Sequence, residues 1–167
     1  MEEPWLRGPI PGVDPMVAPV LMSFQMARED LARFTEGLSF AQLWKEWPGI
    51  ASVGFHLQHI QGSVDRLCHY LEGRPLNERY FVFLAQEAES GPTREELLAG
   101  MDEAFRRCEQ VVRGLGPAEL LEPRFVGRKK LPTTVIGLVV HIAEHTQRHT
   151  GQAIVTAKFA RLDTLPT

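Results

Sequence analysis

What this sequence lacks excludes several classes of protein. Its two cysteines, Cys68 and Cys108, form no CxxC pair and fall within apolar helical patterns, which predicts buried free thiols in a reducing compartment. No apolar run reaches the length that spans a bilayer, and the acidic, proline- and glycine-rich start (MEEPWLRGPIPG) is unlike a signal peptide. A net charge of -3 gives no electrostatic footprint for nucleic acid. We therefore expect a cytoplasmic protein with no membrane and no nucleic-acid partner.

Helical periodicity dominates what is present. A chain of 167 residues with 44% hydrophobic and 23% charged residues fits one globular domain. Apolar residues at spacings of three and four, interrupted by glycine and proline, predict four long helices over residues 15–36, 51–72, 94–113 and 133–161. Short helices are expected over residues 40–47 and 78–88, and residues 122–132 are expected to form an extended basic loop.

These elements predict an all-α fold, because no convincing strand pattern and no internal repeat accompany them. The expected form is a four-helix bundle with long connectors that carry short helices. An irregular N-terminal arm over residues 1–14, where three prolines oppose regular structure, precedes the bundle over 15–162 and a C-terminal tail over 163–167. The run from Tyr80 to Leu84 is unusually apolar for a connector, so it should cover the functional site, a partner subunit or the end of the bundle.

The stretch from Leu138 to Gln152 carries three of the six histidines, spaced four apart, so they lie along one side of a helix. A heptad pattern places two of them on an inner seam that consists of Val135, Leu138, Ile142, His145, His149, Gln152, Thr156 and Phe159. His141 lies beside this seam. Two imidazoles one turn apart on an inner face fit half of a metal site, and the alternative is a hydrogen-bonded polar network in the core.

A polar stripe borders the apolar stripe of the second predicted helix. It consists of Ser52, His56, His59, Ser63, Arg66 and Tyr70. Such a stripe is either a solvated edge or a source of ligands and hydrogen-bond donors for a cavity. His56 and His59 are three residues apart and nearly share a direction, so spacing alone does not choose between them as a metal ligand.

The segments SVGFHLQHIQGSVDRL and VVHIAEHTQRHTGQ together resemble the DinB/YfiT-like superfamily, and the likeness extends over about residues 14–161. Its most specific part is the H-x-x-x-H-x-G-Q element that begins at His145. The resemblance implies a four-helix bundle, often dimeric, with a divalent metal ion held by three histidines, which by position are His59, His145 and His149. Members often have an acidic residue close after the second-helix histidine, where this chain has Gln61 and Gly62.

The resemblance also indicates a function, because the superfamily includes thiol transferases that use a low-molecular-weight thiol and isomerases that depend on one. Three neutral imidazoles leave open coordination positions, as in a catalytic zinc site, and an open metal lowers the pKa of a bound thiol or water. The leading hypothesis is a homodimeric, zinc- or nickel-dependent enzyme that joins a low-molecular-weight thiol cosubstrate to a small electrophilic substrate. A metal-assisted hydrolase and a non-catalytic metal- or ligand-binding, stress-associated bundle stay open as alternatives.

A metal-bound imidazole needs its second nitrogen oriented by a neighbour. The candidates for that role are His56, Ser63, His141, Glu144 and Gln152. HIAEH also matches the H-x-x-E-H pattern of inverted zinc peptidases, in which His141 and His145 would bind the ion and Glu144 would act as the base. The inner seam favours His149 over His141 as the ligand, since His141 is rotated about 100° from the seam residue that follows it.

Overall fold

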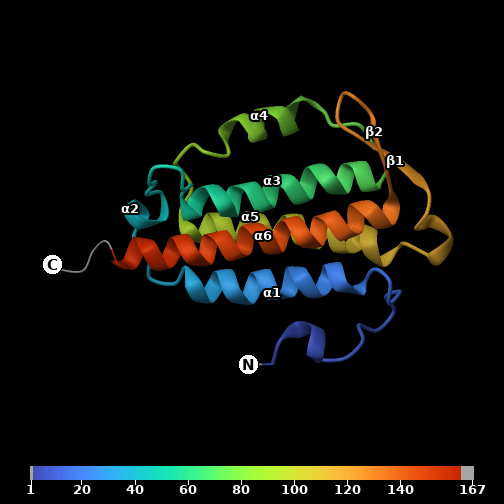
Figure 1. The fold of residues 1–167 in the computed structure, drawn as a ribbon, viewed down its shortest axis with the longest axis horizontal. Helices are drawn as coiled ribbons and strands as arrows, with labels where there is room; N and C mark the ends of the chain where they lie inside the picture. The colour runs from blue at the N-terminus through green and yellow to red at the C-terminus, as the bar shows by residue number, and fades with distance from the viewer. Residues whose placement is uncertain (1, 163–167) are drawn as a thin grey trace.

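The computed structural model describes residues 2–162 and is mostly helical (Figure 1). The long helices are α1 (Ala18–Phe34), α3 (Val53–Leu71), α5 (Arg94–Arg113) and α6 (Val135–Leu162). The shorter elements are the 3-10 helices η1 (Pro4–Leu6) and η2 (Pro117–Glu119), the helices α2 (Phe40–Leu43) and α4 (Glu78–Gln86), and the strands β1 (Pro123–Val126) and β2 (Leu131–Thr134). The predicted tail, residues 163–167, lies outside the described residues.

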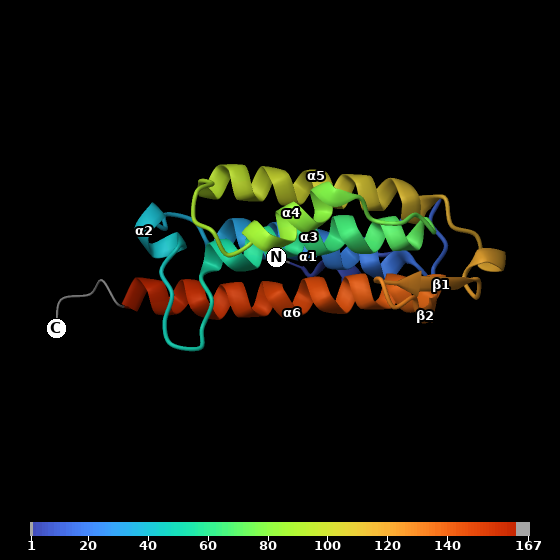
Figure 2. The same cartoon turned by 90° about the horizontal axis from the view of Figure 1, so that it is seen from above.

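The four long helices lie side by side, with α3 against α5 and α6 and with α1 against the same two (Figures 1 and 2). Their inner faces form one core, in which Phe24 of α1 and Phe105 of α5 are fully buried and stack with ring centroids 4.3 Å apart. Helix α4 lies outside this group and runs along α3, and α2 packs near the C-terminal end of α6. No helix among the described residues is long and apolar enough to cross a membrane.

Side-chain caps explain where two of the long helices begin. Ser52 accepts a hydrogen bond from the backbone N–H three residues on at the start of α3, and Thr93 forms a capping box with Glu96 at the start of α5. Inside the core, Cys68 and Cys108 are buried free thiols, as the sequence predicted. A hydrogen bond with Cys68, together with burial, raises the pKa of Cys108.

Residues 122–132 correct the prediction of an extended loop without strands. Residues 123–134 instead form an antiparallel hairpin in which Arg124 pairs with Thr133 and Val126 pairs with Leu131. Each strand has only four residues and starts at or contains a proline, so the alternation typical of strands was too short to recognise. Helix α6 follows β2 directly and begins two residues after the predicted start at residue 133, and the hydroxyl of Thr134 accepts a hydrogen bond from the N–H of Gly137.

The buried face of α6 departs from the predicted heptad seam after Ile142. The buried positions beyond it are Thr146, Thr150, Ala153, Thr156, Ala157 and Ala160, and of these only Thr156 belongs to the predicted seam. A straight helix drifts by about 20° per heptad relative to a 3.5-residue repeat, and over 28 residues that drift rotates the predicted seam away from the core. Gln152 and Phe159 are therefore exposed, while His145 and His149 lie half-buried at the edge of the core, on the side of α3.

Candidate metal centre

Three histidines from two helices converge where α3 packs against α6. One ring nitrogen from each of His59, His145 and His149 lies within 4.8 Å of the other two. His59 Nε2 and His145 Nε2 are 3.4 Å apart, and the ring centroids of His59 and His149 are separated by 4.4 Å. Two nitrogens that bind one tetrahedral zinc ion at 2.0–2.1 Å are themselves about 3.4 Å apart. The spacing of these imidazoles thus fits a shared divalent ion.

The outer nitrogens of two of these rings already have partners. His59 Nδ1 lies 2.7 Å from Glu87 Oε2, and His149 Nδ1 lies 3.1 Å from His56 Nδ1. In both rings Nε2 is consequently the nitrogen left for the centre of the cluster. His145 Nδ1 is buried and has no hydrogen-bond partner among the described residues. The donor set therefore matches what a metal ion requires, with two of the three rings oriented from outside.

Glu87 is the functional residue that sequence reasoning missed. It follows α4, is only 3% exposed, and its Oε1 accepts a hydrogen bond from Arg66 Nη1 at 2.5 Å while Oε2 faces His59. Gln58 donates to the backbone carbonyl of Glu87 at 3.3 Å and so holds the connector in place. The one available signal was the apolar connector itself, which was expected to cover something. It covers α3, and it brings a carboxylate to the polar stripe.

Gly62 makes room for this carboxylate. A Cβ atom at that position would collide with Glu87 Oε1 and would lie 2.6 Å from a ring carbon of Phe83. The absence of a side chain on α3 therefore lets α4 and the residues after it approach the helix closely. His59 is followed by Gln61 and Gly62, and the acidic group near its ring comes from the connector instead.

The five residues predicted to orient the imidazoles have different environments. His56 contacts His149, as expected of such a partner. Ser63 donates its hydroxyl to the carbonyl of Ile60 at 3.1 Å, so it does not orient an imidazole, and Gln152 is exposed. His141 and Glu144 correct the remaining expectation, because both face outward.

His141 and Glu144 form an exposed pair on α6. Their side chains are each 48% exposed and 3.4 Å apart, and Glu144 also forms an ion pair with Arg148, which lowers its pKa. The ring of His141 touches only the edge of His145, with centroids 5.4 Å apart, and His141 is not in the convergent group. This geometry does not match the inverted zinc peptidase pattern, which needs His141 and His145 on one ion.

An open groove of about 680 Å³ borders the cluster. His56 and His149 form part of its wall, the loop before α3 contributes Ile50, and α6 contributes Val155. The ring of Phe55, which also lines the groove, stacks on His59 with centroids 5.4 Å apart. The groove has the size of a small-molecule site and gives access to His56 and His149 from solvent.

The imidazoles of His56, His145 and His149 are neutral at pH 7. Burial lowers the pKa of His56 and of His145 to about 4, and burial lowers the pKa of His149 to about 3, with the neighbouring His59 adding to each effect. A half-buried cluster of rings disfavours charge because the protonated forms lose hydration and repel one another. Neutral imidazole is the form that binds metal, so protons compete only weakly for these nitrogens.

These pKa values predict how the metal-free protein responds to acid. In the unfolded chain the imidazoles take up protons near pH 6.5, whereas in the folded chain His56, His145 and His149 do so only near pH 4 or below. The free energy of unfolding in EDTA should therefore fall as the pH drops from 6.5 towards 4. Urea titrations at pH 7, 6 and 5 measure it. The variant carrying His56→Gln and His149→Gln should show a shallower fall, and an identical slope would contradict the assignment.

A search of curated proteins found no match to the chain. The family model described as the DinB superfamily matches residues 23–153. That segment holds all three convergent histidines, the whole of α3 and the part of α6 up to residue 153. Since the match spans well over half of the 167 residues, the chain belongs to the DinB superfamily.

Proposed function

We propose that this protein binds a divalent metal ion through His59, His145 and His149 and uses it to join a low-molecular-weight thiol to a small electrophile. The observation that carries the proposal is the convergence of three imidazole nitrogens within 4.8 Å, with the outer nitrogens of two rings already partnered. Zinc and nickel are the proposed ions, because imidazole nitrogen suits both. The long helices would then form a four-helix bundle of the DinB/YfiT type around the site.

The residues around the cluster favour a thiol over water as the nucleophile. A divalent ion held by three neutral imidazoles keeps open positions and lowers the pKa of a thiol or water bound there. Both oxygens of Glu87 are engaged by Arg66 and His59, and Glu144 is paired with Arg148, so neither carboxylate is placed to act as a base. A thiol, with an ordinary pKa near 8.5, needs less help to lose its proton than water does.

The groove supports a small and partly apolar substrate. Ile50, Phe55 and Val155 present apolar surface beside His149, and Gln152 and Thr156 add polar groups at the same wall. A pocket that combines mostly apolar walls with a few polar groups next to a metal site suits a small organic molecule. Its position would place the reacting atom of such a molecule near the histidines.

Metal titration of single variants tests the ligand assignment. Equilibrium dialysis with zinc should give close to one ion per chain for the native protein. His149→Ala removes a ligand, so it should lower the affinity by more than the roughly 10–100-fold that changes around the ligands cause. His141→Ala, an exposed histidine on the same helix, is the matched control and should retain the metal. Retention by the His149 variant and loss by the His141 variant would overturn the assignment.

The same proteins test the chemistry. The zinc- or nickel-loaded chain, screened with several electrophiles against several cellular thiols, should consume one thiol and electrophile pair, and His149→Ala should not. Stoichiometric metal without turnover of any pair would favour a non-catalytic metal-binding role. Absence of metal at every loading would instead leave a metal-free ligand-binding protein.

The contact between Glu87 and His59 predicts a second effect on metal affinity. Glu87→Ala should weaken zinc binding by about 10–100-fold, because His59 loses the acceptor that fixes its ring. Glu87→Gln keeps an acceptor oxygen and should lose less, and Gly62→Ala should resemble Glu87→Ala by displacing the carboxylate. Glu89→Ala, an exposed carboxylate two residues on, is the control. Thermal unfolding verifies that each variant folds, and an equal loss with Glu89→Ala would contradict the role of Glu87.

The predicted homodimer has a defined candidate surface on α4. Phe81, Val82 and Leu84 are 39%, 50% and 45% exposed, whereas Tyr80 at the start of the predicted run is buried. We propose that two copies pair through Val82 and Leu84, because exposed apolar residues on one helix favour association. Sedimentation at micromolar concentration should give a dimer for the native chain and a monomer for Val82→Lys. A monomeric native chain would contradict the proposed dimer.

A further inference from the structure

A second hollow, of about 660 Å³, lies away from the histidine cluster, where the end of α3 meets the start of α4 and the β-hairpin. Tyr70, which lines it, follows His59 by eleven residues on α3, a distance of about 16 Å along the helix axis. Four cationic side chains surround it, namely Arg74, Arg124, Arg128 and Lys130, and none of its described lining residues is acidic. The hollow is therefore separate from the candidate metal centre, and its lining is basic, whereas the metal centre consists of histidines.

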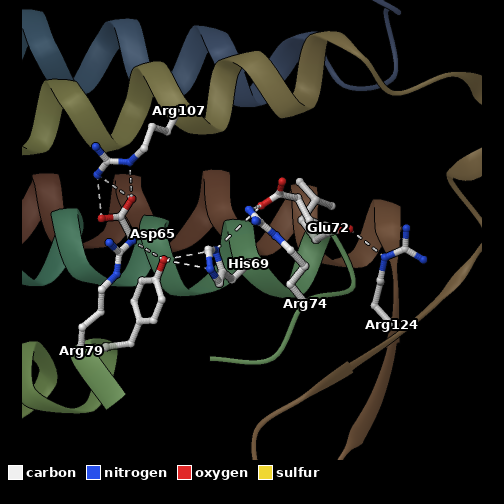
Figure 3. A network of polar contacts seen from close by, with 9 residues as sticks. Asp65, His69, Glu72, Arg74, Arg79, Arg107 and Arg124 are labelled. Atoms are coloured by element: carbon white, nitrogen blue, oxygen red, sulfur yellow. Dashed lines mark hydrogen bonds and ion pairs between the residues drawn. The ribbon is translucent and has the colours of Figure 1, made fainter. Parts of the chain in front are cut away.

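Arg124 is the most firmly held of these cations. Its side chain is 16% exposed, its Nε donates to the carbonyl of Leu71 at 2.7 Å, and its Nη1 donates to the carbonyl of Pro123 at 3.0 Å. Nη2 has no hydrogen-bond partner within residues 2–162. Figure 3 shows Arg124 and Arg74 on either side of the end of α3. A guanidinium fixed in this way presents a free donor without further loss of side-chain entropy.

The hollow keeps a surplus of positive charge after its local ion pairs are counted. Arg74 pairs with Glu72, and Arg124 pairs with Glu122 at 3.1 Å. Arg128 and Lys130 have no carboxylate partner in the described part of the chain. Both side chains extend from the turn between the strands, which includes Gly127 at φ 71° and Lys130 at φ 49°. Two unmatched cations in one hollow attract an anion.

Aromatic rings form the remaining wall. Phe81 of α4 and Phe125 of β1 are 39% and 54% exposed, and both line the hollow together with Tyr70. The guanidinium carbon of Arg128 lies 5.1 Å from the centre of the Phe81 ring, so charge and ring surface are adjacent. Exposed ring faces beside free cations suit a ligand that has a flat apolar part joined to an anionic group.

We propose that this hollow is a binding site for small organic anions in which a phosphate or carboxylate is joined to an aromatic ring. Arg124 Nη2, Arg128 and Lys130 would receive the anionic group, and Phe81 and Phe125 would pack against the ring. The site needs no metal ion and stands independently of the function proposed for the histidines.

Phenyl phosphate is the probe that tests this site, with EDTA present so that no metal at the histidines contributes. Titration followed by amide NMR should show saturable binding with a Kd of about 1 mM or tighter and shifts centred on Gly73 and Gly127. Inorganic phosphate and phenol should each bind more weakly, because each lacks one half of the ligand. Added salt should weaken the binding of phenyl phosphate. Absence of saturable binding, or shifts centred on the histidines, would overturn the proposal.

Two variants test separately the contributions of the cationic and the aromatic side chains to binding. Arg128→Gln should raise the Kd for phenyl phosphate about tenfold, the effect of losing one charged hydrogen bond. Phe125→Ala should reduce the affinity for phenyl phosphate to that for inorganic phosphate. The control is Arg106→Gln, which changes an arginine on α5 that is 63% exposed and lies outside the hollow. An equal loss with Arg106→Gln would show a nonspecific charge effect and refute the site.

Discussion

The packing of α3 against α6 is the contact on which both the core and the histidine cluster depend. Leu57 and Ile60 of α3 are fully buried, and alanines and threonines on α6 let the two helices approach closely. His59 and His149 extend from the edge of the same contact. Their separation is consequently set by the spacing of two packed helices, and a site built on such elements holds its geometry better than one built on loops.

Burial at that edge gives the cluster its chemical character. Rings that are half-buried and mutually close stay neutral at pH 7, as the depressed pKa values of His56, His145 and His149 show. A neutral imidazole carries one N–H and one lone pair, so a partner on the outer nitrogen decides which nitrogen faces inward. Glu87 supplies that partner for His59, and His56 supplies it for His149.

The connector between α3 and α5 contributes side chains to two separate places along α3. At its C-terminal side it delivers Glu87 to His59 over the gap left by Gly62. At its N-terminal side it places Phe81 in the basic hollow beside the hairpin. Helix α4 lies between these two places on the outside of α3 (Figure 1), and its exposed side chains include Val82 and Leu84. One short helix thus contributes to the candidate metal centre, to the proposed anion site and to the proposed dimer surface.

The sequence by itself determined the long helices and the residues able to bind metal. Three features are local in the sequence, namely the apolar spacing in α3, the capping box at Thr93 and the H-x-x-x-H element at His145. Local features can be recognised without knowledge of the fold. The resemblance then selected His59 over its neighbour His56, and the convergence of His59 with His145 and His149 agrees with that choice.

Only the tertiary structure decided what lies around those residues. Glu87 reaches His59 across 28 positions of chain, and no periodicity connects an acidic residue in a connector with a stripe on another helix. The rotation of α6 that exposes Gln152 depends on which face packs against α3, because a 3.5-residue and a 3.6-residue repeat diverge over 28 residues. The hairpin around Gly127 likewise exists through pairing between strands too short to show a pattern of their own.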